Sequence, residues 1–164
     1  MEKTIELKQI TSFRGRYKFL SNFSHSPFVS HVYRDPEAVF KFPTVEHFFQ
    51  ACKAQTASNA RKIVQAKTPR HAKTMGSWVV AWDDWNDIRN DVMLLGLRYK
   101  FTQSSRRVLL LATEEAELIE GNTWNDRYWG CSPVRDAQGN IEWVGENHLG
   151  KLLMQVRTEL QEKQ

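Results

Sequence analysis

Hydrophobic positions in the first quarter of the chain tend to alternate with polar ones, whereas later ones recur at helical spacing. Residues 4–10 alternate in a way that predicts a half-buried strand. Segments 27–33 and 38–42 also favour strands, and residues 34–36 form the turn between them. Residues 13–23, which precede this pair, mix aromatic side chains with Gly and Ser and predict a loop with a short turn.

Helix-capping residues recur from Thr44 onward and divide the rest of the chain into helices. Ser, Thr and Asp accept hydrogen bonds from the free N–H groups of a first helical turn, and proline is favoured at the first helical position. The expected helices are 44–56 with Thr44 as the N-cap, 58–66 with Ser58, 68–76 with Thr68 and Pro69, a long helix from Asp83 or Asp84, a shorter one from Ser104-Ser105 to Ala112, and 147–162.

Two of these helices have apolar residues on one face only. The predicted apolar positions are Ile88, Val92, Leu95 and Tyr99 in the long helix, and Leu149, Leu152, Leu153, Val156 and Leu160 in the last one. Residues 117–120 read as a short strand and 121–146 as a long polar loop. A few strands followed mostly by helices predict the α+β class, with residues 1–164 as a single mostly helical domain that contains a small sheet.

The composition is that of an ordinary globular protein without a membrane span. Hydrophobic residues make up 41% and charged residues 26% of the 164 positions. No apolar stretch approaches the ~20 residues that a spanning helix needs. The first residues also lack the apolar core of a signal peptide. We therefore expect a cytoplasmic protein that has no membrane partner.

The net charge and the residues that could bind a metal limit the functions that this chain can have. A net charge of +4 and an isoelectric point near 9.1 suit a phosphorylated or nucleotide ligand, although no long Lys/Arg block indicates bulk DNA binding. Cys52 and Cys131 are too few for a disulfide framework, and we expect both to be reduced, with Cys52 buried. The five histidines lack ligand spacing, and His47 is expected to be a satisfied structural residue. No dinucleotide or phosphate-loop motif occurs, so neither a metal nor a cofactor is predicted.

The segment from Thr44 to Ala54 is apolar apart from one polar stripe. Glu46 and Lys53 are seven residues apart, which is almost two helical turns, so both point to the same side with Gln50 between them. A polar stripe on a buried helix indicates the wall of a pocket. In the alternative interpretation, Glu46 interacts favourably with the helix dipole in the first turn and Lys53 is solvated.

A second concentration of polar residues lies between Asn122 and Gly130. It contains Asp126, a second carboxylate, together with Trp124 and Trp129. Indole rings are good stacking surfaces for flat heterocycles, although core packing is the commoner role of tryptophan. Asn and Asp in such a loop also shape turns. A carboxylate on a buried helix and another in a Trp-containing loop together favour catalysis.

Several segments, in the same order along the chain, resemble the YbiA/NADAR family. The resemblance covers about residues 13 to 160, and the ordered set is more specific than any one segment. The matching segments are 19–23 (Phe-Leu-Ser-Asn-Phe), 45–53 (Val-Glu-His-Phe-Phe-Gln-Ala-Cys-Lys), 66–76, Trp85, 93–101, 109–113 (Leu-Leu-Leu-Ala-Thr), 122–130 (Asn-x-x-Asn-Asp-x-x-Trp-Gly) and 147–154. Residues 131–146 depart from the family as a longer loop, which bears on substrate choice.

This resemblance implies a YbiA-like, largely helical α+β fold and an N-glycosidase activity without a cofactor. Such enzymes cleave the bond between ribose and an exocyclic amine. Two substrate classes are implied, and the principal expectation is a phosphorylated ribosylaminopyrimidine, an early intermediate of riboflavin synthesis. The other is ADP-ribose attached to guanine, with nucleic acid as the modified substrate. A non-catalytic module that binds nucleotides or ADP-ribose is the alternative to an enzyme.

Residue roles are carried over from the family by motif. The family's proposed active-site positions fall on Glu46, Trp85 and Asp126, and the motif lysine falls on Lys53. The expected catalytic residues are therefore Glu46, Asp126 and Lys53, and the expected substrate-binding residues are Trp85, Asn22, Trp129, Lys73, Arg14 and Asn122.

Cleavage of the C1′–N bond gives each of the expected catalytic residues a role. Breaking a ribosylamine C1′–N bond builds positive charge on the sugar, and a nearby carboxylate stabilises that charge. A second carboxylate activates water or protonates the leaving amine, by analogy with glycoside hydrolysis. Glu46 and Asp126 take these two roles, in an order that the sequence leaves open. Lys53 permits another route, in which a desolvated amine forms a Schiff base with C1′.

Overall fold

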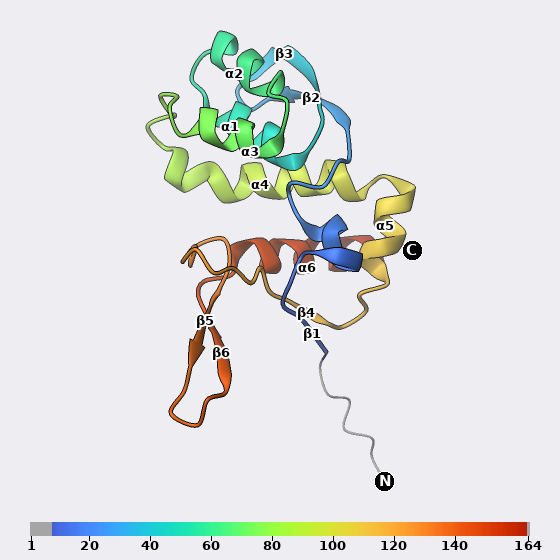
Figure 1. Ribbon diagram of the computed structural model, residues 1–164. Helices are drawn as coiled ribbons and strands as arrows, with labels where there is room; N and C mark the ends of the chain where they lie inside the picture. The colour runs from blue at the N-terminus through green and yellow to red at the C-terminus, as the bar shows by residue number, and fades with distance from the viewer. Residues whose placement is uncertain (1–7, 164) are drawn as a thin grey trace. The chain divides into compact units, whose positions relative to one another are not determined.

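The computed structural model describes residues 8–163 and contains both helices and short strands, which confirms the α+β class (Figure 1). Of the predicted strand 4–10, residues 9 and 10 form β1, and residues 4–7 lie outside the described part. Within residues 8–163, no helix is both long enough and apolar enough to cross a membrane. The elements in chain order are β1 (Gln9–Ile10), the 3-10 helix η1 (Gly15–Leu20), β2 (Phe28–Val32), β3 (Asp35–Phe42), α1 (Val45–Lys53), α2 (Ala57–Val64), α3 (Pro69–Gly76), α4 (Trp85–Phe101), α5 (Ser104–Leu111), β4 (Glu117–Leu118), β5 (Ser132–Arg135), β6 (Ile141–Val144) and α6 (His148–Gln161).

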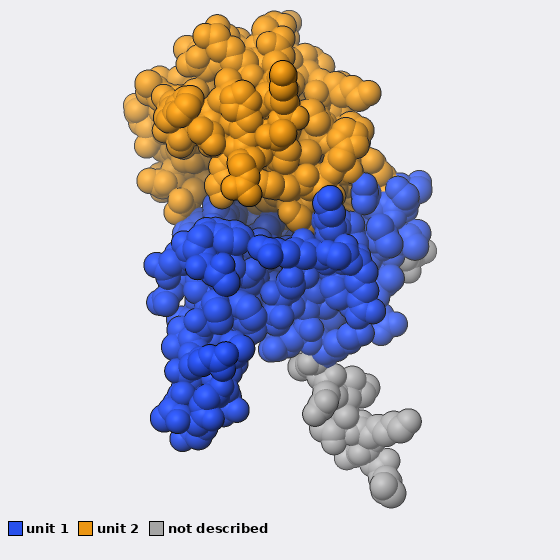
Figure 2. Space-filling model, in the orientation of Figure 1, with its two compact units in different colours: residues 1–20, 104–164 blue, residues 21–103 orange. Residues whose placement is uncertain are grey.

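The chain divides into two compact units (Figure 2). Unit 2 is the continuous segment 21–103, and unit 1 combines the residues before it with those after it. Each unit contains fully buried hydrophobic side chains, such as Phe48 in unit 2 and Leu153 in unit 1. The expectation of a single domain stays a prediction.

Helix α1 is the most buried element of unit 2. Its residues 45–52 are all buried, and it contacts α2, α3, α4 and both strands of the unit. Phe48 on this helix packs edge-on against Phe42 and Phe28, with ring centroids 5.2 and 5.6 Å apart. Burial of such large aromatic side chains is a dominant stabilising contribution. The polar side chains of α1 therefore project from a backbone that is held on several sides.

The β2–β3 hairpin turns one position earlier than predicted. The two strands are antiparallel, with Phe28 opposite Phe42. Arg34 adopts a left-handed φ of 65°, which reverses the chain there, so that β3 already begins at Asp35. Pro36 lies within β3 rather than in the turn. Strand β3 tolerates a proline because, among the described residues, this sheet has two strands and each leaves one edge free of ladder hydrogen bonds.

Threonine caps begin three of the helices in unit 2. Thr44 and Thr68 accept hydrogen bonds from the N–H groups three residues further on, which confirms the predicted starts of α1 and α3. The start of α2 differs from the prediction, because Thr56 rather than Ser58 provides the cap. Helix α1 ends at Lys53, earlier than predicted, because Ala54 becomes extended and bridges to Ala81.

Helix α4 buries a face that differs in part from the predicted one. Val92 is fully buried as expected, but Ile88, Leu95 and Tyr99 are only half-buried. The reason is Gly96, where a Cβ would lie 2.8 Å from Phe48 Cδ1, so α1 packs against that side instead. The buried residues of α4 are Trp85, Val92, Met93, Gly96, Leu97, Lys100 and Phe101.

Helix α6 packs against the short parallel pair β1–β4 in unit 1. Gln9 lies opposite Glu117 in this pair. Gly150 permits the close approach, since a Cβ there would lie 2.0 Å from the carbonyl oxygen of Leu118. Leu152 is half-buried rather than buried, whereas the unexpected Arg157 is buried and donates to Thr113 Oγ1 at 2.8 Å and to Ala116 O at 2.9 Å.

The predicted polar loop 121–146 contains a regular hairpin, so that prediction was wrong for its second half. Strands β5 and β6 pair antiparallel with Ser132 opposite Val144, and the hairpin extends away from α6 (Figure 1). Asp136 forms its turn by accepting N–H groups from Gln138 and Asn140. The strands carry little hydrophobic pattern because both are largely exposed.

Candidate functional site

The residues expected at the site belong to both units. Unit 2 holds Glu46, Lys53, Trp85, Asn22 and Lys73, and unit 1 holds Asp126, Trp129, Asn122 and Arg14. Within unit 2, a main-chain hydrogen bond joins Glu46 to Asn22, whereas Lys53 donates separately to the Gly76 carbonyl. Lys73 and Arg14 are exposed, and within residues 8–163 neither side chain forms a hydrogen bond or an ion pair.

Glu46 is a buried carboxylate at the start of α1. It is only 6% exposed, and its N–H donates to Asn22 O at 3.2 Å. Its Oε1 accepts a hydrogen bond from Gln50 Nε2 at 2.8 Å, one helical turn along. Gln50 is itself buried. A hydrogen bond from a buried neutral amide fixes the orientation of the carboxylate without cancelling its charge.

Helix α3 ends against this polar stripe at Gly76. A Cβ at this position would lie 1.9 Å from Gln50 Oε1, so only glycine leaves room for the amide. The Gly76 carbonyl accepts from Lys53 Nζ at 2.9 Å. Because Lys53 is partly buried, desolvation lowers the pKa of its amine below the ordinary value. Lys53 is therefore anchored rather than solvated, and the contribution of Gly76 beyond ending a helix was missed from sequence.

Asn22 contributes a buried acceptor beside the first turn of α1. Its Nδ2 lies 3.3 Å from the Met93 sulfur, and within the described chain its buried Oδ1 has no hydrogen-bond partner. Buried amide oxygens are almost always hydrogen-bonded in folded proteins. The Oδ1 atom therefore has the capacity to accept a hydrogen bond from a ligand or a water molecule, close to Glu46.

Trp85 begins α4 and packs against α1. Its ring is tilted by 54° against that of Phe49, with 5.0 Å between ring centroids. The residue is only 8% exposed. A ligand that stacks on this indole would have to use the small part of its surface that Phe49 and the rest of the fold leave uncovered.

Asp126 and Asn122 organise the polar loop of unit 1. Asp126 Oδ1 accepts the N–H groups of Tyr128 and Trp129 at 3.2 and 3.0 Å, which is a turn-shaping role. Asn122 is 3% exposed and holds Asp126 from both sides, through Asp126 N–H to its Oδ1 and its Nδ2 to Asp126 O. Ser132 Oγ also donates to Asn122 Oδ1, so the amide of Asn122 is fully engaged.

Trp129 lies in a small aromatic cluster of unit 1. Its half-buried ring meets that of Tyr128 edge-on at 5.0 Å, and Tyr128 packs against His148 with 4.3 Å between centroids. The carbonyl of Trp129 accepts the N–H of Leu149 in the first turn of α6. The loop that carries Asp126 is thereby joined to the start of α6.

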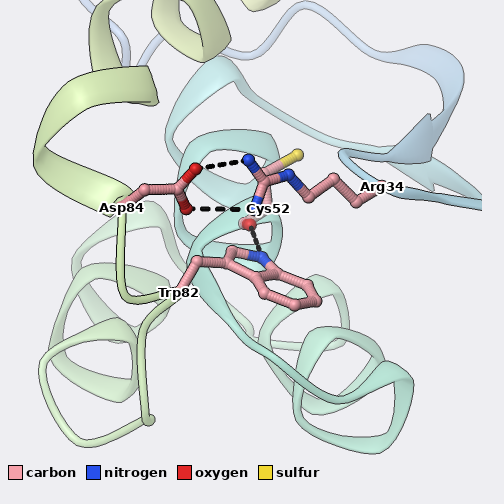
Figure 3. Close-up of polar contacts among 4 residues, drawn as sticks. All are labelled: Arg34, Cys52, Trp82 and Asp84. Atoms are coloured by element: carbon pink, nitrogen blue, oxygen red, sulfur yellow. Dashed lines mark hydrogen bonds and ion pairs between the residues drawn. The ribbon is translucent and has the colours of Figure 1, made fainter.

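A cluster that sequence reasoning missed connects the β2–β3 turn with the start of α4 (Figure 3). The Arg34 guanidinium forms two hydrogen bonds with the Asp84 carboxylate, at 3.0 and 2.5 Å. This contact lowers the pKa of Asp84 below its ordinary value. Trp82 Nε1 donates to Cys52 O at 3.1 Å, at the end of α1. The sequence predicts a turn at Arg34 but not its left-handed φ of 65° or its pairing with Asp84.

The two cysteines are free and buried. Burial raises the pKa of Cys52 to about 12 and also raises that of Cys131, so neither thiol is a nucleophile at neutral pH. His47 is satisfied as expected, with Nδ1 2.8 Å from Thr44 Oγ1 and Nε2 3.0 Å from Ala66 O. Among residues 8–163, no three His, Cys, Asp or Glu side chains gather in a way that could hold a metal ion.

Comparison with known proteins identifies the class. A model of the NADAR domain matches residues 11–161. The N-glycosidase YbiA of Shigella flexneri serotype 5b is 39% identical over 122 residues, which cover 73% of this chain and 71% of that protein. An N-glycosidase of Nostoc punctiforme is 33% identical over 151 residues, covering 88% and 86%. The chloroplastic riboflavin biosynthesis protein PYRR of Zea mays is 34% identical over 167 residues, which are 92% of this chain but 25% of that protein.

A solved structure supports the same assignment. The NMR structure of YbiA from E. coli has a TM-score of 0.72 and 32% identity, and the match covers 97% of this chain and 89% of that one. This likeness confirms the predicted YbiA-like fold. The chain belongs to the NADAR family, as the matched residues and the identities to its relatives establish.

Proposed function

We propose that this N-glycosidase hydrolyses the C1′–N bond between ribose and an exocyclic amine, with a phosphorylated ribosylaminopyrimidine as its principal substrate. The observation that carries the proposal is the buried Glu46 carboxylate, which Gln50 holds in one orientation on a rigid helix. The names of the relatives, two of them N-glycosidases and one a riboflavin biosynthesis protein, support the reaction and the substrate class.

Glu46 acts where positive charge develops. As the C1′–N bond breaks, its electron pair leaves with the amine and the sugar becomes an oxocarbenium-like cation. A preoriented carboxylate in a low-dielectric environment stabilises that cation more than water does, because it does not need to reorganise. Water then adds to C1′, and the proton it releases balances the proton that the departing amine takes up.

Asp126 supplies the second carboxylate in this proposal. One of its oxygens already accepts two backbone N–H groups, whereas Oδ2 has no hydrogen bond from the described residues. Oδ2 is therefore available to activate water or to pass a proton to the leaving amine. Asn122 becomes a positioning residue, since its amide is fully used in holding the Asp126 backbone.

Substrate contacts complete the proposal. Asn22 Oδ1 is an acceptor for a ribose hydroxyl, because it is buried and unsatisfied near Glu46. The exposed cations Lys73 and Arg14 bind the phosphate of the substrate. Trp85 and Trp129 are the stacking surfaces for the heterocycle.

Lys53 is the basis of a second route. Its lowered pKa leaves a larger fraction of neutral amine than an exposed lysine has, as Schiff-base formation at C1′ requires. Borohydride trapping during turnover tests this route. A covalent adduct on Lys53 supports it, whereas an active Lys53→Arg enzyme without any adduct excludes it.

Mass spectrometry of the products tests the function itself. The protein is incubated with a ribosylaminopyrimidine phosphate and, separately, with ADP-ribosylated guanosine. We expect release of ribose 5-phosphate from the first, with at least about 100-fold slower turnover by Glu46→Gln at unchanged fold. Full activity of Glu46→Gln would overturn the assignment of Glu46.

The alternatives predict different products. Release of ADP-ribose from guanosine alone would make the protein an enzyme that removes ADP-ribose from nucleic acid. Tight binding of either compound without product, equally strong for Glu46→Gln, would indicate a non-catalytic nucleotide-binding module.

A further inference from the structure

Residues 21–24 form a tight turn at the start of unit 2, which we call the Asn22 turn. The carbonyl of Ser21 closes it by accepting the N–H of Ser24 at 3.1 Å. Asn22 occupies its first corner, and the Asn22 carbonyl accepts the N–H of Glu46. Within the described chain, two buried side-chain atoms of the turn, Asn22 Oδ1 and Ser24 Oγ, have no hydrogen-bond partner. The turn therefore holds polar atoms that a ligand or water can use, next to the first turn of α1.

A fully buried lysine holds this turn in place. Lys100, near the end of α4, is 0% exposed, and its Nζ donates to Ser21 O at 2.8 Å. The carbonyl that closes the turn thus accepts a second donor, and a charged donor makes the stronger hydrogen bond. Met93 lies seven residues earlier on the same side of α4, with its sulfur 3.3 Å from Asn22 Nδ2. Helix α4 therefore contacts both the closing carbonyl and the Asn22 side chain.

The cost of burying a charge shows that stability alone does not account for a lysine at position 100. Removing an ammonium group from water is unfavourable, and apolar residues of similar volume often leave stability unchanged or raise it. An apolar side chain could also pack beside Phe101, whose ring centroid lies 5.1 Å from Lys100 Nζ. It could not donate to Ser21 O. The property that only a side chain such as lysine supplies is the donor to the Asn22 turn.

The Asn22 turn in turn supports the first turn of α1. The first N–H groups of a helix have no acceptor within the helix and need one from elsewhere. The N–H of His47 donates to Thr44 Oγ1 at 3.2 Å, whereas the N–H of Glu46 donates to Asn22 O at 3.2 Å. A displaced Asn22 turn would therefore deprive Glu46 of its acceptor and leave the neighbouring His47 bonded as before.

We propose that Lys100 is a positioning residue for the hydrolysis, because it fixes the Asn22 turn and thereby the placement of Asn22 Oδ1 beside Glu46. The inference rests on the proposed function, in which Asn22 accepts a ribose hydroxyl and Glu46 stabilises the cationic sugar. Lys100 does not touch the substrate in this account. It acts through the Ser21 carbonyl, the Asn22 corner and the first turn of α1, in that order.

Amide hydrogen exchange measured by NMR on the full-length protein tests this arrangement without any substrate. Lys100→Met removes the donor and keeps an unbranched side chain. Exchange of the Glu46 N–H should become at least about tenfold faster, because its acceptor moves, while exchange of the His47 N–H should change by less than about twofold. An equal increase at both positions would indicate general loosening of α1 and would overturn the inference.

Steady-state kinetics with the ribosylaminopyrimidine phosphate measure the effect on the reaction. For Lys100→Met, kcat/KM should fall at least about tenfold, since small displacements of substrate-positioning groups are costly. In combination with Asn22→Ala, the loss should be smaller than the product of the two single losses, because both substitutions act on one turn. An unchanged kcat/KM for Lys100→Met, or losses that simply multiply, would contradict the proposed role.

Ile63→Ala separates positioning from loss of stability. Ile63 is a fully buried apolar residue of α2, so its truncation destabilises unit 2 through a cavity. The ratio of Glu46 to His47 exchange and the value of kcat/KM should nevertheless stay as in the natural sequence. The same changes in Ile63→Ala as in Lys100→Met would assign them to stability and remove the support for positioning.

Circular dichroism establishes that each variant is folded. If Lys100→Met is unfolded, Lys100→Gln replaces it, since the glutamine amide is one bond shorter and does not reach Ser21 O. Failure of both variants to fold would make Lys100 a residue required for folding, against the inference.

Failure of the inference is distinguishable from failure of the proposed function. If the natural sequence releases no ribose 5-phosphate, the proposed function is wrong, and the role of Lys100 in hydrolysis is lost with it. Normal turnover by Lys100→Met would leave the proposed function in place and overturn the inference alone.

Discussion

At the scale of single residues, the backbone at position 76 determines how the Glu46 carboxylate is held. Gln50 reaches Glu46 only because Gly76 has no side chain, and the same glycine offers its carbonyl to Lys53. The positions of three polar side chains of α1, those of Glu46, Gln50 and Lys53, thus depend on the absence of a side chain at one position of α3. Nothing in the local sequence distinguishes this requirement from an ordinary helix-ending glycine.

Gly76→Ala is therefore expected to lower the free energy of unfolding, by about 1–3 kcal/mol. The new Cβ would lie 1.9 Å from Gln50 Oε1 and 2.6 Å from its Cδ, so the amide must move away from Glu46. Turnover should fall as well, because the carboxylate loses a donor. Urea unfolding and steady-state kinetics measure the two effects.

The double variant Gln50→Ala/Gly76→Ala is the control. Because it removes the clashing amide, its stability should be higher than the sum of the two single effects predicts. Simple additivity would show that the crowding at Gly76 lies elsewhere.

At the scale of elements, the Arg34–Asp84 pair joins the β2–β3 turn to the N-terminus of α4 (Figure 3). Hydrogen bonding to Arg34 lowers the Asp84 pKa, so the contribution of this pair is present above the ordinary carboxyl pKa and is lost as the pH falls through the lower value. Arg34→Gln should raise the Asp84 pKa toward the ordinary value in a carboxyl NMR titration. Arg61→Gln, which removes an arginine over the Phe40 ring, should leave that pKa as it is.

His47 joins α1 to the connection between α2 and α3, and this gives stability a pH dependence. Burial lowers its pKa below the ordinary 6.5, so below about pH 6.5 the unfolded chain binds a proton that the folded protein resists. The free energy of unfolding should therefore fall as the pH is lowered from 7.5 to about 5.5, by at most about 1.4 kcal/mol per pH unit. Urea unfolding at several pH values measures this slope.

His47→Gln tests whether this histidine is the cause. The variant should be less stable at neutral pH but should lose part of the slope, since the exposed histidines are common to both proteins. An unchanged slope would assign the pH dependence to other groups.

Elements with strong end signals were predictable from sequence, and elements defined by tertiary contacts were not. Thr44 and Thr68 cap helices whose starts are predictable from sequence, because an N-cap is a local interaction. The cap of α2 was misplaced since both Thr56 and Ser58 can accept the required hydrogen bond. The buried face of α4 depends on where Gly96 admits Phe48, which is a contact between distant residues.

The candidate site follows the same division. Helical spacing alone predicts that Glu46, Gln50 and Lys53 share one side of α1, and the hydrogen bond between Glu46 and Gln50 confirms this for the first two. The satisfied state of Asn122 and the unsatisfied oxygen of Asn22 depend on partners far along the chain, so neither could be predicted. The roles of these residues in catalysis stay predictions.

At the scale of the whole molecule, the order of the segments along the chain makes the stability of unit 1 depend on the folding of unit 2. Unit 1 is built from both ends of the chain, and its β1–β4 pair joins Gln9 to Glu117 across the whole of unit 2. If unit 2 unfolds, this pairing must close a much longer flexible loop, and the entropic cost of closure rises with loop length. The predicted single domain should therefore unfold in one transition.

Hydrogen exchange measured by mass spectrometry at increasing urea concentration tests this expectation. Peptides from the buried parts of α4 and α6 report on unit 2 and unit 1 respectively. We expect coincident midpoints for the two peptides. Folded unit 2 holds the ends of β1 and β4 close together, and without it the entropic cost of closing the loop between them is larger. If the α6 peptide stays protected at urea concentrations where the α4 peptide exchanges freely, unit 1 holds together without unit 2 and the chain consists of two domains.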